Sequence, residues 1–104
     1  MTWPVKRDSS CVRGLLWRVE PPEDLEVEQL IAALLANGLT EHGTPGVIRH
    51  LSAADETAVI VVPKTRRVQI RLSYLVDPSE REAKARFVAA SIAQWAALPA
   101  GIDP

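Results

Sequence analysis

The chain has 104 residues, of which 47% are hydrophobic and 24% are charged, and this composition excludes a disordered tail, a collagen-like fibre and a low-complexity segment. The length suits one globular domain. The formal net charge of −1 provides no overall field that would attract nucleic acid or an anionic membrane.

Cysteine content and apolar runs indicate the compartment. Cys11 is the only cysteine, so an intramolecular disulfide and a cysteine-based zinc site are both excluded. A core without disulfides suits a reducing compartment. The apolar run at residues 15–17 is shorter than the roughly seven residues of a signal-peptide core, and no stretch approaches the roughly 18 residues of a membrane span. We therefore expect a cytoplasmic protein.

The N-terminal region is predicted to hold an arm and a first strand. Residues 1–10 are polar and contain Pro4, so we expect a flexible arm unless Trp3 docks on the domain. Residues 11–99 are predicted to form one α+β domain, and residues 100–104 a short tail. A strand is expected at residues 12–20, which are rich in Val, Leu and Trp, before Pro21.

The middle of the chain predicts a helix and three strands. Apolar residues recur at intervals of three and four between positions 27 and 35, which is typical of a helix with one buried face. Asp24 is its expected N-cap, and Gly38 is its expected end. A Gly- and Pro-rich loop at residues 42–46 comes next, and strands are predicted at residues 47–51, 57–62 and 67–75.

The last helix has the clearest start signal. Asp77 is the expected N-cap, and Pro78 occupies the first helical position, where its missing N–H costs nothing. The helix is expected to end at Pro99, with a buried stripe made of Ala83, Phe87, Val88, Ser91, Ile92 and Trp95. The order β-α-β-β-β-α predicts an α+β two-layer sandwich, with a mostly antiparallel four-stranded sheet and two helices on one face.

The sequence offers no convincing catalytic, metal or cofactor set. His42 lies in the loop and His50 in a predicted strand, and nothing brings either within hydrogen-bond reach of a nucleophile such as Cys11 or Ser73. Two histidines without a carboxylate motif do not define a metal site. We expect no catalytic residue, no cofactor and no metal, and an enzyme using His42 or His50 with Cys11 is the weakest alternative.

A basic hairpin suggests a nucleic-acid alternative. Cations cluster at its tip and on the following strand (Lys64, Arg66, Arg67 and Arg71), where they either solvate the sheet or meet an acidic partner or a phosphate backbone. Residues 25–98 read helix–three strands–helix, and Glu80-Arg81-Glu82-Ala83-Lys84 is similar to the Lys-Lys-x-Ala-Lys clamp of double-stranded RNA-binding domains, although Glu80 replaces a cation. The basic hairpin and the start of the last helix, together with this resemblance, give the alternative hypothesis of RNA or single-stranded nucleic-acid binding through Lys64, Arg66, Arg67, Arg71, Arg81 and Lys84.

The apolar pattern of the strands predicts an interaction surface. If Ala58, Ile60 and Val62 face the helices, Val59 and Val61 point away from them. The consecutive Leu15, Leu16 and Trp17 cannot all face one way either. We therefore expect an outward apolar centre with a polar rim, and partner-binding residues Leu15, Trp17, Val59, Val61, Arg67, Gln69 and Arg71.

This surface leads to the main functional hypothesis. The chain is interpreted as a small non-catalytic protein-interaction module of the adaptor, chaperone or inhibitor type. The expected partner is another protein or a second copy of the chain, in a homodimer formed through the open sheet face. The alternative for the face itself is that Trp3 and the N-terminal arm fold back and cover it.

Overall fold

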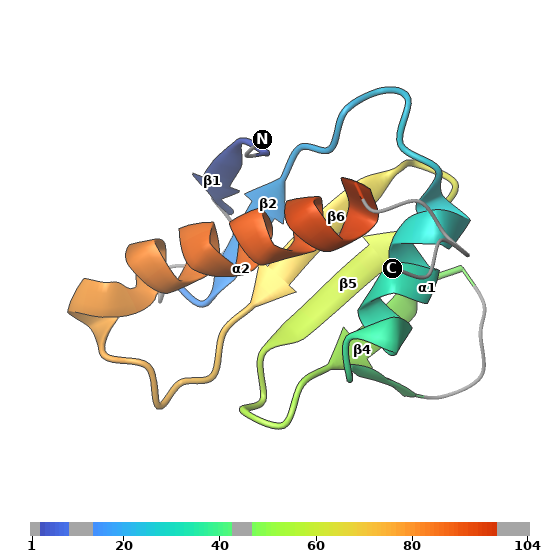
Figure 1. Cartoon of the computed structure of the whole chain (residues 1–104). Coiled ribbons are helices and arrows are strands. Elements are labelled where there is room, and N and C mark those ends of the chain that lie inside the picture. The colour runs from blue at the N-terminus through green and yellow to red at the C-terminus, as the bar shows by residue number, and fades with distance from the viewer. Residues whose placement is uncertain (1–2, 9–13, 43–46, 98–104) are drawn as a thin grey trace.

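A six-stranded antiparallel sheet forms one layer of the fold, and two helices lie against one of its faces (Figure 1). The computed structural model describes residues 3–8, 14–42 and 47–97. The strand order is β1-β2-β6-β5-β4-β3. The elements are β1 Val5–Arg7, β2 Leu16–Val19, α1 Val27–Ala36, β3 Thr40–His42, β4 Arg49–Ser52, β5 Ala58–Val62, β6 Arg67–Arg71, η1 Pro78–Glu80 and α2 Arg81–Ala97.

The prediction of a small α+β domain with an antiparallel sheet and two helices is confirmed, but the sheet has six strands where four were predicted. Both additional strands are three-residue strands at the edges of the sheet. β1 lies inside the predicted flexible arm, where Val5 pairs with Val19 and is buried. β3 pairs with β4 and includes His42, which was predicted to lie in the loop. Such short, polar strands lack an apolar pattern of their own and form because a neighbour supplies hydrogen bonds.

The two helices begin and end close to their predicted positions, with different capping at α1. Glu26, not Asp24, precedes α1 and makes no side-chain cap, whereas Gly38 follows the helix with φ 93°, as a glycine stop requires. The Asp77 carboxylate accepts a hydrogen bond from the Ser79 N–H at 2.9 Å, which confirms the predicted cap at η1.

The buried face of α2 differs from the predicted stripe. Ile92 and four alanines are its buried residues, and the small side chains of these alanines let the helix approach the sheet closely: Ala85, Ala89, Ala93 and Ala96. Phe87 was expected in the core, but its side chain is 66% exposed. The predicted stripe is thus correct in part: Ile92 is buried and Val88 and Trp95 pack against the core, whereas Ala83 and Phe87 are exposed.

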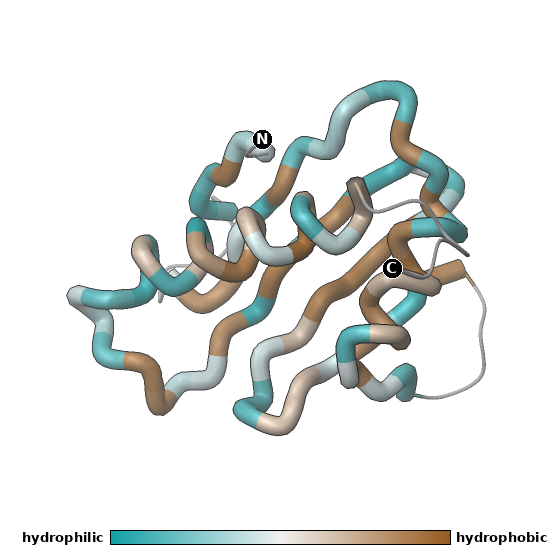
Figure 2. Tube along the Cα trace, in the orientation of Figure 1, coloured by the Kyte–Doolittle hydropathy of each residue, from teal (hydrophilic) through white to brown (hydrophobic). Residues whose placement is uncertain are grey.

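The two faces of β5 are the reverse of the prediction. Val59 pairs with Ile70, and Val61 pairs with Val68. Residues directly opposite each other on antiparallel strands point to the same side. Val59 and Val61 are 1% and 0% exposed and belong to the core beneath the helices, while Ile60 and Val62 point outward and are half-buried. In Figure 2 the hydrophobic colour runs along β5, as expected for a strand that is apolar on both sides.

Trp17 was likewise expected to face outward and does not. It pairs with Ile70, is 5% exposed, and its indole N–H donates to the Gly14 carbonyl at 2.8 Å. The same register places Leu16 on the outward side with Arg71. Leu15 is half-buried and packs against the core.

Adjacent valines on β5 provide a test of this orientation. We expect Val61→Ala to lower the free energy of unfolding by about 2 kcal/mol, because it leaves a cavity in the core. Val62→Ala is the matched control, and we expect it to cost less than about 1 kcal/mol, since its methyls already contact water. Urea denaturation of both variants gives the comparison, and a larger loss for Val62→Ala would contradict the assignment of the faces.

Candidate functional site

The candidate site is the face of the sheet that points away from α1 and α2, named here the outer face. Its residues alternate along the strands with the buried ones, and the register joins them across the sheet. One row crosses all six strands and consists of His42, His50, Ile60, Gln69, Arg18 and Lys6. The remaining strand residues of this face are Leu16, Thr40, Ser52, Ala58, Val62, Arg67 and Arg71.

An apolar strip lies in the middle of the outer face. Leu16, Ile60 and Val62 are half-buried, and Ala58 is buried. Within the part of the chain that the structure describes, neither helix packs on this side (Figure 1). The strip therefore keeps apolar surface in contact with water. A partner that binds on the strip would bury this surface.

Cations border this strip. Lys6, Arg18, Arg67 and Arg71 are exposed, and the outer face has no Asp or Glu among the described strand residues. Asp8, which follows β1, accepts a hydrogen bond from the Gln69 side-chain amide at 3.0 Å. The outer face is thus positive although the whole chain has a formal charge of −1.

Two histidines and an arginine lie together at one end of the outer face. The His42 and His50 rings are 5.3 Å apart between centroids. Arg71 Nη2 lies 3.4 Å from His50 Nε2, and His42 Nε2 is hydrogen-bonded to Ser52 Oγ. Partial burial lowers the pKa of His50 below its usual value, and the positive charges of Arg71 and His42 lower it further.

Glu41, the acid that precedes His42 in the sequence, points to the other side of the sheet. Glu41 pairs in register with the buried Leu51. It accepts two hydrogen bonds from Arg49, one of them from Nη2 to Oε1 at 2.9 Å. These hydrogen bonds hold the pKa of Glu41 below its usual range. The hydrogen bond between Ser52 and His42 is of the kind that joins a nucleophile to its general base. Glu41 cannot orient His42 as the acid of a catalytic triad would, because it is bonded to Arg49 on the opposite face.

The predicted partner-binding residues are divided between the two faces. Arg67, Gln69 and Arg71 lie together on the outer face, where they were expected. Val59, Val61 and Trp17 lie beneath the helices instead. Leu16, Ile60 and Val62 are the outward apolar residues, and of these Ile60 and Val62 were predicted to face the helices.

The predicted nucleic-acid residues do not form one surface. Arg66 donates to the Pro22 and Leu25 carbonyls at 2.8 and 2.7 Å, so it ties the β5–β6 turn to the segment before α1. Arg81 donates to the Val76 carbonyl at 3.0 Å, and Lys84 pairs with Asp55 at 3.2 Å. Arg67 and Arg71 remain on the outer face, and Lys64 is exposed at the turn.

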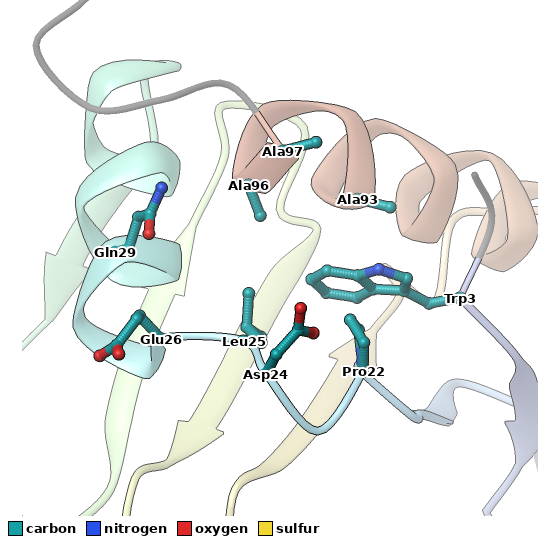
Figure 3. Close-up of a pocket in the computed structure, with 9 residues that line it drawn as sticks. All are labelled: Trp3, Pro22, Asp24, Leu25, Glu26, Gln29, Ala93, Ala96 and Ala97. Atoms are coloured by element: carbon teal, nitrogen blue, oxygen red, sulfur yellow. The ribbon is translucent and has the colours of Figure 1, made fainter.

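Clefts also lie on the helix side, and two of them are lined partly by apolar side chains. One, of about 260 Å³, is formed between the start of α1 and the end of α2, and the Trp3 ring lines it together with Pro22 and Ala93 (Figure 3). Trp3 is 5% exposed, so it docks here and does not cover the outer face. The other, of about 250 Å³, is largely apolar and lies beside Phe87 and Trp95, with Lys84 and Asp55 at its polar end.

Comparison with protein families, with curated proteins and with solved structures gave no match to this chain. Among the described residues, His, Cys, Asp and Glu form no group of three or more that could hold a metal ion. No helix in the same ranges is long and apolar enough to cross a membrane. Ser9, Ser10 and Cys11 lie outside the described residues, as does the predicted tail at residues 100–104.

The contact between Arg71 and His50 predicts how the pKa of His50 responds to a substitution. Replacing Arg71 with Gln removes a positive charge from beside the ring, so the protonated form of His50 becomes less unfavourable and its pKa rises. NMR titration of the histidine ring protons in both proteins measures this directly. An unchanged or lowered pKa for His50 in Arg71→Gln would contradict the geometry.

Proposed function

We propose that this chain is a non-catalytic protein-interaction domain that binds an acidic segment of a partner protein on the outer face. The observation that supports the proposal is a sheet face on which neither helix packs within the described ranges, with a half-buried apolar strip and a border of cations. Protein interfaces have this arrangement, because an apolar centre supplies burial and a charged rim supplies orientation and specificity.

Charge favours an acidic partner over a second copy. In a two-fold contact between outer faces, the same patch meets itself. Arg18, Arg67 and Arg71 of one copy would then approach the same cations of the other, and no described strand residue of the outer face is an acid that could compensate. Juxtaposed like charges are costly. The homodimer predicted from the sequence therefore ranks below an acidic partner.

The size of the apolar strip indicates modest affinity. Leu16, Ile60 and Val62 are already partly covered, so their complete burial contributes about 1 kcal/mol each, or less. Rim ion pairs add a contribution that salt screens. The expected complex is a weak one that dissociates at high ionic strength.

Binding of RNA or single-stranded nucleic acid is the second candidate. It is supported by the exposed Arg18, Arg67 and Arg71 on the same face. Of the cations expected to take part, Arg66, Arg81 and Lys84 are engaged in contacts within the chain. Few cations remain to contact phosphates, so the affinity for nucleic acid should depend only weakly on the salt concentration.

A model peptide tests the proposed surface. We expect a peptide of alternating aspartate and isoleucine to shift the amide NMR signals of β2, β5 and β6, since an extended segment places acids and apolar side chains at the spacing of a strand. Ile60→Glu should weaken binding about tenfold, because it puts an acid in the apolar strip. The matched control is Gln94→Glu, which adds the same charge at an exposed position of α2 and leaves binding unchanged.

Shifts confined to α1 and α2, or equal binding by the two variants, would contradict the proposal. Tighter binding of a single-stranded oligouridine than of the peptide would favour the second candidate instead.

Sedimentation velocity tests the choice of partner. We expect the chain to be monomeric at about 100 μM and about 0.1 M salt, because its outer faces repel each other when the cations are only partly screened. A dimer that Ile60→Glu converts into a monomer would restore the homodimer as the preferred interpretation.

A further inference from the structure

Four hydrogen-bonding side chains from three strands meet at one end of the outer face, and are named here the histidine–arginine cluster: His42 of β3, His50 and Ser52 of β4, and Arg71 of β6. They form a continuous chain of contacts. Arg71 Nη2 lies 3.4 Å from His50 Nε2, the two imidazole rings are 5.3 Å apart, and His42 Nε2 bonds to Ser52 Oγ.

Ala58 makes this meeting possible. It lies on β5 between Ser52 and Arg71 in the register. Arg71 must therefore cross β5 to reach His50, which lies about two strand spacings away, roughly 9.6 Å, and one row of side chains further along β4. The alanine methyl is 1% exposed, so it lies beneath other atoms and leaves room for the longer side chain. A larger residue at position 58 would block this path.

The cluster concentrates positive charge without an acid to balance it. In the described ranges, Arg71 and His50 take part in no ion pair. Glu41 is bonded to Arg49 on the opposite face, and Glu56 accepts a hydrogen bond from the Ser73 hydroxyl at 3.2 Å. Partial burial is the main reason that the pKa of His50 is lowered, and the positive charges of Arg71 and His42 lower it further.

We propose that the histidine–arginine cluster binds a tetrahedral dianion of the phosphate-monoester class, carried by the acidic partner segment as a phosphorylated side chain. The choice of carrier rests on the proposed function, whereas anion binding by the cluster does not. Arg71 donates charge-assisted hydrogen bonds to the oxygens, the protonated histidines donate N–H groups, and Ser52 donates its hydroxyl. An anion bound in the cluster lies where the positive charges of Arg71 and the protonated histidines otherwise face one another.

A divalent cation fits the cluster less well. Imidazole pairs bind zinc or copper only through unprotonated nitrogens. Here His42 Nε2 is bonded to Ser52, and the Arg71 guanidinium lies against His50 Nε2. The two ligand classes also respond oppositely to acid, because protonation strengthens anion binding and opposes metal binding.

Sulfate is the probe for the anion site, because it keeps both charges between about pH 6 and pH 7.5, where histidine titrates. The charged or titratable groups facing the cluster are His42 from β3, His50 from β4 and Arg71 from β6, and β5 contributes the uncharged Ala58 and Ile60. We expect NMR titration to shift the signals of His42, His50 and Ser52. Affinity should rise as the pH falls, by up to about tenfold per pH unit for each proton taken up.

Two arginines of β6 give a matched pair of variants. Arg71→Gln should weaken sulfate binding about tenfold, because it removes the main donor. Arg67→Gln removes the same charge from the same face, about 13 Å along the strand, and should weaken binding less than about twofold at 0.1 M salt. Equal effects of the two variants, binding that weakens in acid, or an absence of sulfate binding at pH 6 would overturn the proposal.

The source of the phosphate is tested with the aspartate–isoleucine peptide carrying one phosphoserine. Tighter binding than that of the unphosphorylated peptide, lost in Arg71→Gln, supports a phosphorylated partner. Competition by free phosphate without any gain from the phosphoserine assigns the site to a small phosphate compound and overturns the choice of carrier. Val62→Ser separates the two proposals, because it removes apolar surface from the strip without adding a charge, and it should weaken peptide docking and leave sulfate binding intact.

Discussion

The register between β5 and β6 determines which side chains of the sheet lie in the core and which lie on the outer face. Residues 63–66 join these two strands, and Val62 pairs with Arg67 at the start of the hairpin. Arg66 has φ 58° and anchors the turn to the carbonyls of Pro22 and Leu25. A shift of one residue would exchange the two faces of β5 and place Ile60 in the core. The core, the outer face and the histidine–arginine cluster all follow from this one pairing.

The sequence predicted the parts of the fold that carry strong local signals. Asp77 and Pro78 marked the start of the last helical segment, and the alternation of Val68 and Ile70 gave the correct buried side of β6. Edge strands were missed because segments of only three residues have no recognisable period. The stripe of α2 was misjudged because its contacts are made by alanines, whose small size matters only once a sheet is packed against them.

The orientation of β5 is the instructive error. Five consecutive apolar residues satisfy either phase of a two-residue period, so β5 alone cannot reveal which side is buried. The neighbouring strand contains the missing information. A four-residue turn places Val62 opposite Arg67, and a charged residue next to a turn faces water, so Val62 faces outward as well. Reading the hairpin as a unit would have predicted the outer face, including Ile60, from sequence.

The outer face combines two kinds of recognition on one rigid surface. Its apolar strip is non-directional and tolerates many extended partners. The histidine–arginine cluster is directional, since its donors are fixed by three strands and by the small residue at position 58. A segment with apolar side chains and one phosphate would satisfy both, and its binding would respond to pH and to phosphorylation. Position 58 links the two, because its alanine opens the path that Arg71 takes across the apolar strip.

The most direct test of this account is the solvent accessibility of methyl groups in the free protein. A soluble paramagnetic agent broadens the NMR signals of methyls that water can reach and spares those in a packed core. We expect strong broadening for Ile60, Val62 and Leu16, and little for Val59 and Val61. Broadening of Val59 and Val61, with protection of Ile60 and Val62, would show the opposite register and contradict the assignment of the outer face.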